Sequence, residues 1–134
     1  MRTVYPVYNL EAIEKEWGLL VPFFSRLVDD HMSLDDIWGH LESGEWHLWI
    51  DDVDGEIVSI AVTSFIYYPQ YTALRIILTA GSDTDWAAAT EFLENVAKAN
   101  RCDTVEILGR KGWERALKSR GFEFQNITLR KRLR

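Results

Sequence analysis

The sequence has little of what several common protein classes need. It has one cysteine and three histidines among 134 residues, so neither an internal disulfide framework nor a cysteine-rich zinc site can form. Its longest apolar-rich stretch, residues 57–68, is interrupted by Ser and Thr and is too short to span a bilayer. Residues 1–5 lack the basic start and the apolar run of a signal peptide. We therefore expect a cytoplasmic protein without a membrane partner, although a protein packaged into a virion would have the same composition.

What is present predicts a folded chain. Hydrophobic residues make up 47% of it and aromatic residues 13%, which excludes a disordered or low-complexity protein. A length of 134 residues fits one domain, which we assign to residues 1–134. The formal net charge is −6, whereas a protein that binds nucleic acid without sequence preference is normally basic. Nucleic acid is therefore not an expected partner.

The charge is unevenly distributed along the chain. Residues 1–107 contain 6 Lys/Arg and 19 Asp/Glu, a net of −13, and residues 108–134 contain 9 Lys/Arg and 2 Asp/Glu, a net of +7. Within the basic part, helical spacing places Lys111, Arg115 and Lys118 on one face. Such a face can hold a phosphate or an acidic protein partner, and it can equally be a solvated surface.

Apolar spacing in the first third of the chain predicts one strand and two helices. Residues 3–8 are β-prone. Asn9 can cap a helix whose apolar residues recur at helical spacing as far as residue 28, and Pro22 should kink or restart it. Ser33 begins a second, short helix that ends near Gly44.

The period then changes to two. Trp46, Leu48 and Ile50 alternate with polar or opposite-facing residues, which indicates a strand. Further patterns predict strands at 56–66, 72–79, 104–108 and 122–131 and helices at 86–100 and 111–119. The order is β-α-α-β-β-β-α-β-α-β, an α+β (mixed α/β) chain with one central mixed sheet. An antiparallel meander leads into a right-handed parallel crossover.

This order is similar to that of the GNAT (Gcn5-related N-acetyltransferase) fold over essentially the whole chain. Residues 74–78 resemble the family's fourth strand, residues 104–108 its fifth, and residues 116–122, with their final Gly-Phe, its last helix-to-strand passage. The resemblance implies a three-layer arrangement. The segment Gly109-Arg110-Lys111-Gly112-Trp113-Glu114-Arg115 also resembles small GNAT-like proteins of tailed phages.

Family members that bind acetyl-CoA usually present an Arg/Gln-x-x-Gly-x-Gly/Ala loop, where backbone N–H groups at a helix start receive the pyrophosphate. The matching window here is residues 84–89, in which Ala87 and Ala89 keep the small positions while the Arg and the first Gly are replaced. Asp83 and Asp85 add carboxylates that can cap the same N–H groups. If acetyl-CoA binds, the resemblance implies contacts from Leu78, Thr79, Ser82, Thr84, Trp86, Ala87 and Arg110.

The family's proton-transfer groups are also altered. Many members place a Tyr four residues before the final Gly-Phe to protonate the leaving thiolate, and here that residue is Leu117. Among the three histidines, His47 is the candidate general base, because it alternates with strand residues near the middle of the sheet. The alternative is that His47 is a half-exposed strand residue with no catalytic role. No His-Glu-x-x-His spacing is present, so no metal site is expected.

A loop rich in aromatic residues is the best sign of a contact surface. Tyr67, Tyr68 and Tyr71 lie in the predicted connection 67–71, where core packing cannot use them all. Together with Lys111, Arg115 and Lys118 they are the candidate partner-binding residues. The partner would be a protein, from a phage or its host if the chain is phage-encoded. The family's tendency to dimerise implies a homodimer as one arrangement.

Two functions fit these observations. The first is an N-acyltransferase that transfers an acetyl group from acetyl-CoA to an amine. The second is a GNAT-fold protein with a degenerate acetyl-CoA loop that acts by contact, as an accessory or structural component. The sequence favours the second, because the loop and the proton donor are altered together. It does not decide whether the chain is an enzyme.

Overall fold

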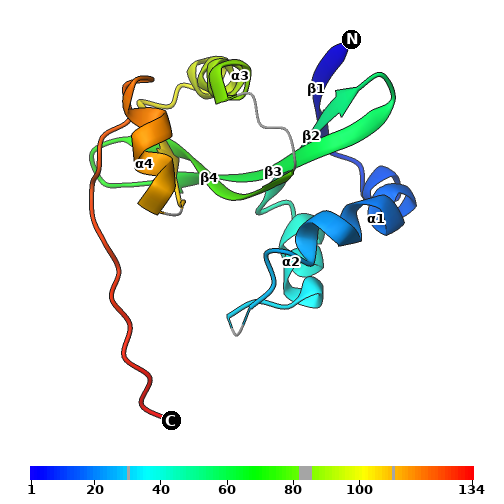
Figure 1. Ribbon diagram of the computed structural model, residues 1–134, viewed down its shortest axis with the longest axis horizontal. Helices are drawn as coiled ribbons and strands as arrows, with labels where there is room; N and C mark the ends of the chain where they lie inside the picture. Colours follow the sequence, from blue (N-terminus) through cyan, green and yellow to red (C-terminus); the bar gives the residue numbers. More distant parts are fainter. Residues whose placement is uncertain (30, 82–85, 110) are drawn as a thin grey trace.

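The computed structural model describes residues 1–29, 31–81, 86–109 and 111–134, without the side chains of residues 86–88, 111 and 112. Among these residues, helices and strands follow the predicted order from residue 2 to residue 118 (Figure 1). In chain order they are β1 (Arg2–Val7), α1 (Leu10–Phe24), α2 (Leu34–Glu42), β2 (His47–Val53), β3 (Glu56–Tyr67), β4 (Thr72–Gly81), α3 (Trp86–Ala99), β5 (Thr104–Ile107) and α4 (Lys111–Lys118).

Local capping fixes the starts of the first two helices. The Asn9 side chain accepts a hydrogen bond from the Glu11 N–H at 2.8 Å, and Ser33 and Asp36 form a reciprocal capping box at the start of α2. Pro22 lies inside α1, which ends two residues later at Phe24. The predicted continuation to residue 28 was wrong. After Phe24 the chain makes tighter turns, in which the N–H groups of Arg26 and Leu27 donate to the carbonyls of Phe23 and Phe24.

The five strands form one sheet in the order β1-β2-β3-β4-β5. The pairs β1–β2, β2–β3 and β3–β4 are antiparallel and β4–β5 is parallel, so the predicted meander and parallel crossover are confirmed. Trp46 was predicted to begin β2, but the strand begins at His47. Trp46 instead stacks on His40 of α2, with ring centroids 4.2 Å apart.

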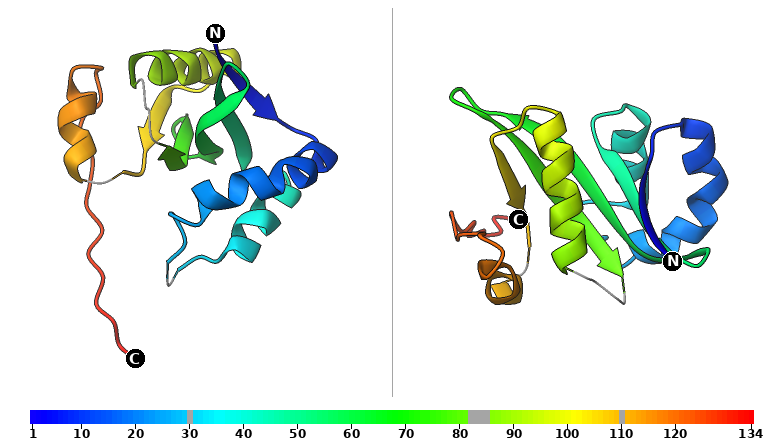
Figure 2. Two further views of the ribbon diagram at one scale, coloured as in Figure 1. Left: turned by 45° about the vertical axis from the view of Figure 1, so that its right-hand side comes forward. Right: turned by 90° about the horizontal axis from the view of Figure 1, so that it is seen from above.

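Helices cover both faces of the sheet, which confirms the three-layer arrangement (Figure 2). On one face α1 and α2 bury a cluster with residues of β2 and β3, including Phe24, Ile37 and Ile50, each fully buried. On the other face α3 packs against β2, β4 and β5 around Trp49, Leu74 and Leu93. Alternation along each strand divides its side chains between these two clusters.

The predicted last strand, residues 122–131, is not formed. This segment is extended, but no strand assignment covers it, and the sheet ends at β5. Figure 1 shows residues 122–134, which we call the tail, running past α4 and away from the sheet. Strand-like sequence was not sufficient here, because a strand also needs a neighbour to pair its backbone.

Candidate functional site

The pairing of β4 with its two neighbours changes in the middle of the strand. Its pairing with β5 runs from Ala73 to Ile76, after which β4 continues to Gly81 with β3 alone. At the same level the β3 register passes from Thr63↔Ile76 to Val62↔Leu78, so Ile77 is an extra residue on β4. Such a β-bulge bends a strand and increases its twist. The second half of β4 therefore has an open side within the described sheet.

A cavity of about 460 Å³ lies beside this open half, and we call it the β4 cavity. Its volume is within the range of small-molecule sites. Its lining comes from both faces of the sheet, since it includes Ala80 and Leu27 of the α1–α2 side as well as Ala61 and Leu93 of the α3 side. The lining residues are Val4, Arg26, Leu27, Trp49, Ile50, Asp51, Ser59, Ile60, Ala61, Ile76, Thr79, Ala80, Gly81, Ala89, Thr90, Leu93 and Trp113.

Two close approaches shape the walls of the β4 cavity. At Gly81, with φ of 157°, a Cβ atom would lie 2.2 Å from Cβ of Ser59, so the end of β4 can approach β3 only with glycine. At Gly109 a Cβ atom would lie 2.2 Å from the Trp113 ring. Gly109 therefore lets Trp113 fold back from α4, where this ring forms part of the lining.

The lining also contains a buried ion pair. Asp51 is 7% exposed, and its Oδ1 accepts a hydrogen bond from Nε of Arg2 at 2.9 Å. A second Arg2 nitrogen donates to Oδ2, which also accepts from the Ser59 hydroxyl at 3.0 Å. A buried carboxylate needs such partners. Because Arg2 offsets its charge, Asp51 does not by itself make the cavity repel an anion, and Arg26 adds a cation to the lining.

The predicted cofactor residues have different outcomes. Thr79 lines the β4 cavity, whereas Leu78 packs against the α1–α2 cluster on the other side of the strand. Trp86 and Ala87 lie in the first turn of α3, and their side chains are not described, so their role toward a cofactor stays a prediction. Ser82, Thr84 and Arg110 fall outside the described residues, as do Asp83 and Asp85.

His47, the candidate base, is half-buried at the start of β2. Its ring lies 5.4 Å from that of Phe65, and burial lowers its pKa below the ordinary value, so the neutral form is favoured. It is not part of the lining of the β4 cavity. Its role as a base stays a prediction.

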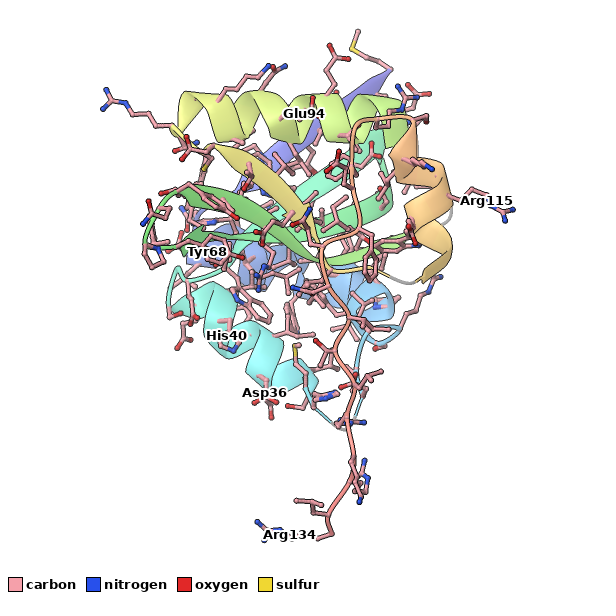
Figure 3. All side chains as sticks on the ribbon, turned by 90° about the vertical axis from the view of Figure 1, so that its left-hand side faces the viewer. Asp36, His40, Tyr68, Glu94, Arg115 and Arg134 are labelled. Carbon is pink, nitrogen blue, oxygen red and sulfur yellow. The ribbon has the colours of Figure 1, made fainter. Side chains whose placement is uncertain are left out.

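The candidate partner residues divide into two groups. Tyr67 at the end of β3 and Tyr71 in the β3–β4 connection are exposed, and so is Lys118 on α4. Arg115 is also exposed and points away from α4 (Figure 3). Lys111 begins α4, but its side chain is not described. Tyr68, in contrast, is held within the structure.

The Tyr68 hydroxyl donates to Glu106 at 2.8 Å and accepts from Arg75 at 2.8 Å, and Arg75 Nε lies 2.9 Å from the same carboxylate. The bond to Glu106 raises the pKa of Tyr68. Tyr68 therefore ties the β3–β4 connection to β5, which is a structural use of a residue that the sequence assigned to a partner.

Reasoning from the sequence did not place Asp51 or Trp113 at the site. A signal existed for both. Asp51 shares the α3-facing side of β2 with Trp49 by simple alternation, and Trp113 is the one aromatic residue of α4. What the sequence could not reveal is the cavity that brings the two side chains to one site.

Metal ligation and membrane crossing have no support among the described residues. No group of three or more His, Cys, Asp or Glu side chains there is arranged to hold a metal ion. None of the described helices combines the length and the apolar character that crossing a bilayer requires.

No protein-family model and no curated protein sequence matches the chain. Solved structures do match its fold. A predicted acetyltransferase with acetyl-CoA from Clostridium acetobutylicum has a TM-score of 0.69 at 19% identity, over 99% of this chain and 97% of that one. Ribosomal-protein-alanine N-acetyltransferase from Brucella melitensis biovar Abortus 2308 has a TM-score of 0.69 at 12% identity, covering 98% and 99%.

Glucosamine-6-phosphate N-acetyltransferase from Arabidopsis thaliana also matches, with a TM-score of 0.69 at 11% identity and coverage of 100% of this chain and 99% of that one. At these identities the likeness shows the fold. The chain has the GNAT fold, which confirms the resemblance at that level.

Proposed function

We propose that the β4 cavity receives the acyl-pantetheine arm of acetyl-CoA and that the protein is an N-acyltransferase. The observation that carries this is the open half of β4, where a cavity lined from both faces of the sheet follows directly on the last β4–β5 pair. One solved structure with the same fold contains acetyl-CoA, which supports the ligand class.

The backbone of β4 suits an extended ligand that contains amides. Alternate residues of a strand direct N–H and C=O to either side, and between Leu78 and Gly81 the described strands offer a partner on one side alone. A pantetheine arm carries two amides and can pair with such an edge in the manner of an added strand. Mostly apolar walls, among them Ala61, Leu93 and Trp113, suit its methylene groups.

The reaction is attack of an amine nitrogen on the thioester carbonyl, with loss of the amine proton and departure of the CoA thiolate. The described lining supplies hydroxyls from Ser59, Thr79 and Thr90 but no His, Tyr, Lys or Cys. Its one carboxylate, that of Asp51, is held by Arg2 and Ser59. Leu117, at the family's Tyr position, is 4% exposed and packs inside the fold. Catalysis would then depend on proximity and on water-mediated proton transfer, so we expect slow turnover that rises with pH until the amine itself is deprotonated.

A second candidate function is binding without catalysis, as an accessory or structural protein. The lack of His, Tyr, Lys and Cys among the described lining residues favours it, and so does the exposed apolar surface of the tail. The association with tailed phages, which residues 109–115 suggest, belongs to this candidate and stays a prediction.

Isothermal titration with acetyl-CoA tests the ligand. Ala89 lines the cavity from α3, so Ala89→Leu should fill part of it and weaken binding at least about tenfold, as one or two misplaced methylenes do in a fitted pocket. Ala99→Leu is the matched control, because Ala99 is exposed at the end of the same helix. No heat from the unaltered protein at millimolar acetyl-CoA would refute the proposed ligand.

A thiol-release assay with a panel of amines tests the reaction separately. Amine-dependent release that Ala89→Leu abolishes supports the acyltransferase. Tight binding of acetyl-CoA without release above the uncatalysed rate would support binding without catalysis.

A further inference from the structure

The charged groups of the β4 cavity do not balance one another. Among the described residues that line it, Arg26 and Asp51 are the ones with charged side chains. Asp51 is held by Arg2 and by the Ser59 hydroxyl, so the fold itself offsets its charge. No ion pair of the described residues includes Arg26. The described lining therefore carries one uncompensated positive charge.

Arg26 is held beside the cavity by the connection between α1 and α2. Its N–H donates to the Phe23 carbonyl at 3.2 Å in the turn that follows α1. Its guanidinium carbon lies 5.9 Å from the centroid of the Phe23 ring, whose face attracts a cation. This contact limits where the exposed guanidinium can lie and leaves its N–H donors for a ligand.

The other described side chains of this connection do not offset the charge. The Asp29 carboxylate accepts from the backbone N–H of His31 at 2.7 Å and lies 3.3 Å from a nitrogen of the same residue's ring. Leu27, which follows Arg26, lines the cavity with an apolar side chain. The α1–α2 side of the cavity thus combines one guanidinium with apolar walls.

The two sides of the cavity suit different parts of a reaction that joins two molecules. We place the cofactor toward α3, where Ala89 and Thr90 belong to the lining. The α1–α2 side, with Arg26 and Leu27, is then left for the amine that accepts the acetyl group. Because both sides belong to one cavity, a small amine bound by Arg26 can reach the open half of β4.

We propose that the acceptor is a small primary amine that also carries a carboxylate or a phosphate, and that Arg26 binds this anionic group. The inference rests on the proposed acyltransferase function. A guanidinium binds either anion through paired, charge-assisted hydrogen bonds. A second ammonium group would instead meet a like charge, so diamines and other polycations should be poor acceptors. Arg26 then acts in acceptor binding and not in proton transfer.

A thiol-release assay with four matched amines tests the substrate class. γ-Aminobutyrate carries a carboxylate, aminopropyl phosphate a phosphate, butylamine no second charge and putrescine a second ammonium group. At saturating acetyl-CoA, kcat/KM for one anionic amine should exceed that for butylamine at least about fivefold, and putrescine should be the poorest acceptor. The better of the two anionic amines identifies the anion. Equal values for all four, the highest value for putrescine, or no release with either anionic amine would overturn the proposal.

Variants of Arg26 test its role. Arg26→Gln should raise KM for the preferred anionic amine at least about fivefold and leave kcat and the KM of butylamine unchanged. Arg26→Glu should reverse the order and make putrescine the better acceptor. Arg115→Gln is the matched control, because Arg115 is exposed on α4 and is not part of the described lining. An anionic preference that survives Arg26→Gln contradicts the role of Arg26.

Binding of a reaction product provides a measurement that needs no turnover. N-acetyl-γ-aminobutyrate and the uncharged N-acetylbutylamine are titrated into the protein in the presence of saturating CoA. The charged product should bind at least about fivefold more tightly, and Arg26→Gln should remove the difference. Equal affinities in the unaltered protein contradict the proposal.

Failure of this inference differs from failure of the proposed function. Arg26→Gln should not change the affinity for acetyl-CoA, which isothermal titration measures. If acetyl-CoA does not bind the unaltered protein, the proposed function and this inference fail together. If acetyl-CoA binds and butylamine reacts as well as the anionic amines, the acyltransferase stands and the acceptor class is wrong.

Discussion

The two halves of the sheet are built from similar strands but differ in how completely these strands are paired and covered. In the covered half, β1, β2 and β3 pair along almost their full lengths beneath α1 and α2, and the central side chains are fully buried. In the open half, β4 carries the bulge at Ile77, β5 has four residues, and both leave backbone without a strand partner in the described structure. The β4 cavity lies where the two halves meet, since residues of β2 and β3 such as Trp49 and Ala61 line it beside those of β4, and the exposed tail belongs to the open half.

The difference shows how a small chain can combine a stable core with a binding site. In the covered half the strands pair along almost their full lengths, and α1 and α2 bury its apolar face. Incomplete pairing in the open half leaves donors and acceptors that a ligand or a second chain can use. Changes in the covered half should therefore affect stability, and changes in the open half should affect binding.

The largest expected effect on stability is that of Phe24→Ala. Phe24 is fully buried between α1 and the sheet, so its removal should lower the free energy of unfolding by about 3–5 kcal/mol. Trp113→Ala, in the wall of the β4 cavity, should cost less than about 2 kcal/mol because that ring is only partly buried. Urea denaturation measures both. Equal losses would mean that the open half is as much a core as the covered half.

Gly81→Ala should have the next largest effect. The added Cβ atom would collide with Ser59 at a φ of 157°, so about 1–3 kcal/mol of stability should be lost as β4 moves away from β3. Because the displaced residues line the cavity, acetyl-CoA affinity should fall as well. Unchanged affinity alongside reduced stability would show that the end of β4 does not contact the ligand.

Gly18→Ala, in the covered half, should stabilise the protein, in contrast to the two preceding predictions. A Cβ atom added at Gly18 of α1 would meet nothing within 4 Å, so the change should raise stability by about 0.5–1 kcal/mol through helix propensity. Ligand affinity should not change. Destabilisation would indicate an unseen contact of the exposed side of α1.

The smallest expected effect is a pH dependence at His47. Burial lowers its pKa in the folded state, so the unfolded chain binds the proton more readily, and stability should fall as the pH drops below the ordinary histidine pKa. The fall should end once the pH is below the folded-state pKa. His47→Gln should remove this component from the pH profile of the melting temperature, and an identical profile for the variant would contradict it.

The sequence predicted most of the fold because its patterns are local. Alternation at Leu48 and Ile50 defines β2, and the cap at Asn9 defines the start of α1. The tail shows the limit of such patterns. Apolar and polar residues alternate at positions 127–133, which indicates a strand whether or not another strand is available to pair with it. Whether a strand forms depends on an available edge, and that is a property of the folded sheet or of a second chain.

The site was less predictable than the fold. The bulge at Ile77 lies within a run of aliphatic residues that shows no change of period, so the sequence does not reveal where β4 and β5 part. The lining residues come from β1 to α4, and no local motif relates Asp51 to Trp113. The family loop was the better guide, because it directed attention to the start of α3, next to which Ala89 and Thr90 line the cavity.

Amide exchange with and without acetyl-CoA tests the division between the halves most directly. Acetyl-CoA should slow exchange or shift the amide signals at Leu78–Gly81 of β4 and at Ala89 and Thr90 of α3, while residues 37–41 of α2, which do not line the cavity, stay unchanged. That pattern is expected if a ligand pairs with the open side of β4. Changes centred on α1 and α2, or no change at saturating acetyl-CoA, would contradict the assignment of the ligand to the β4 cavity.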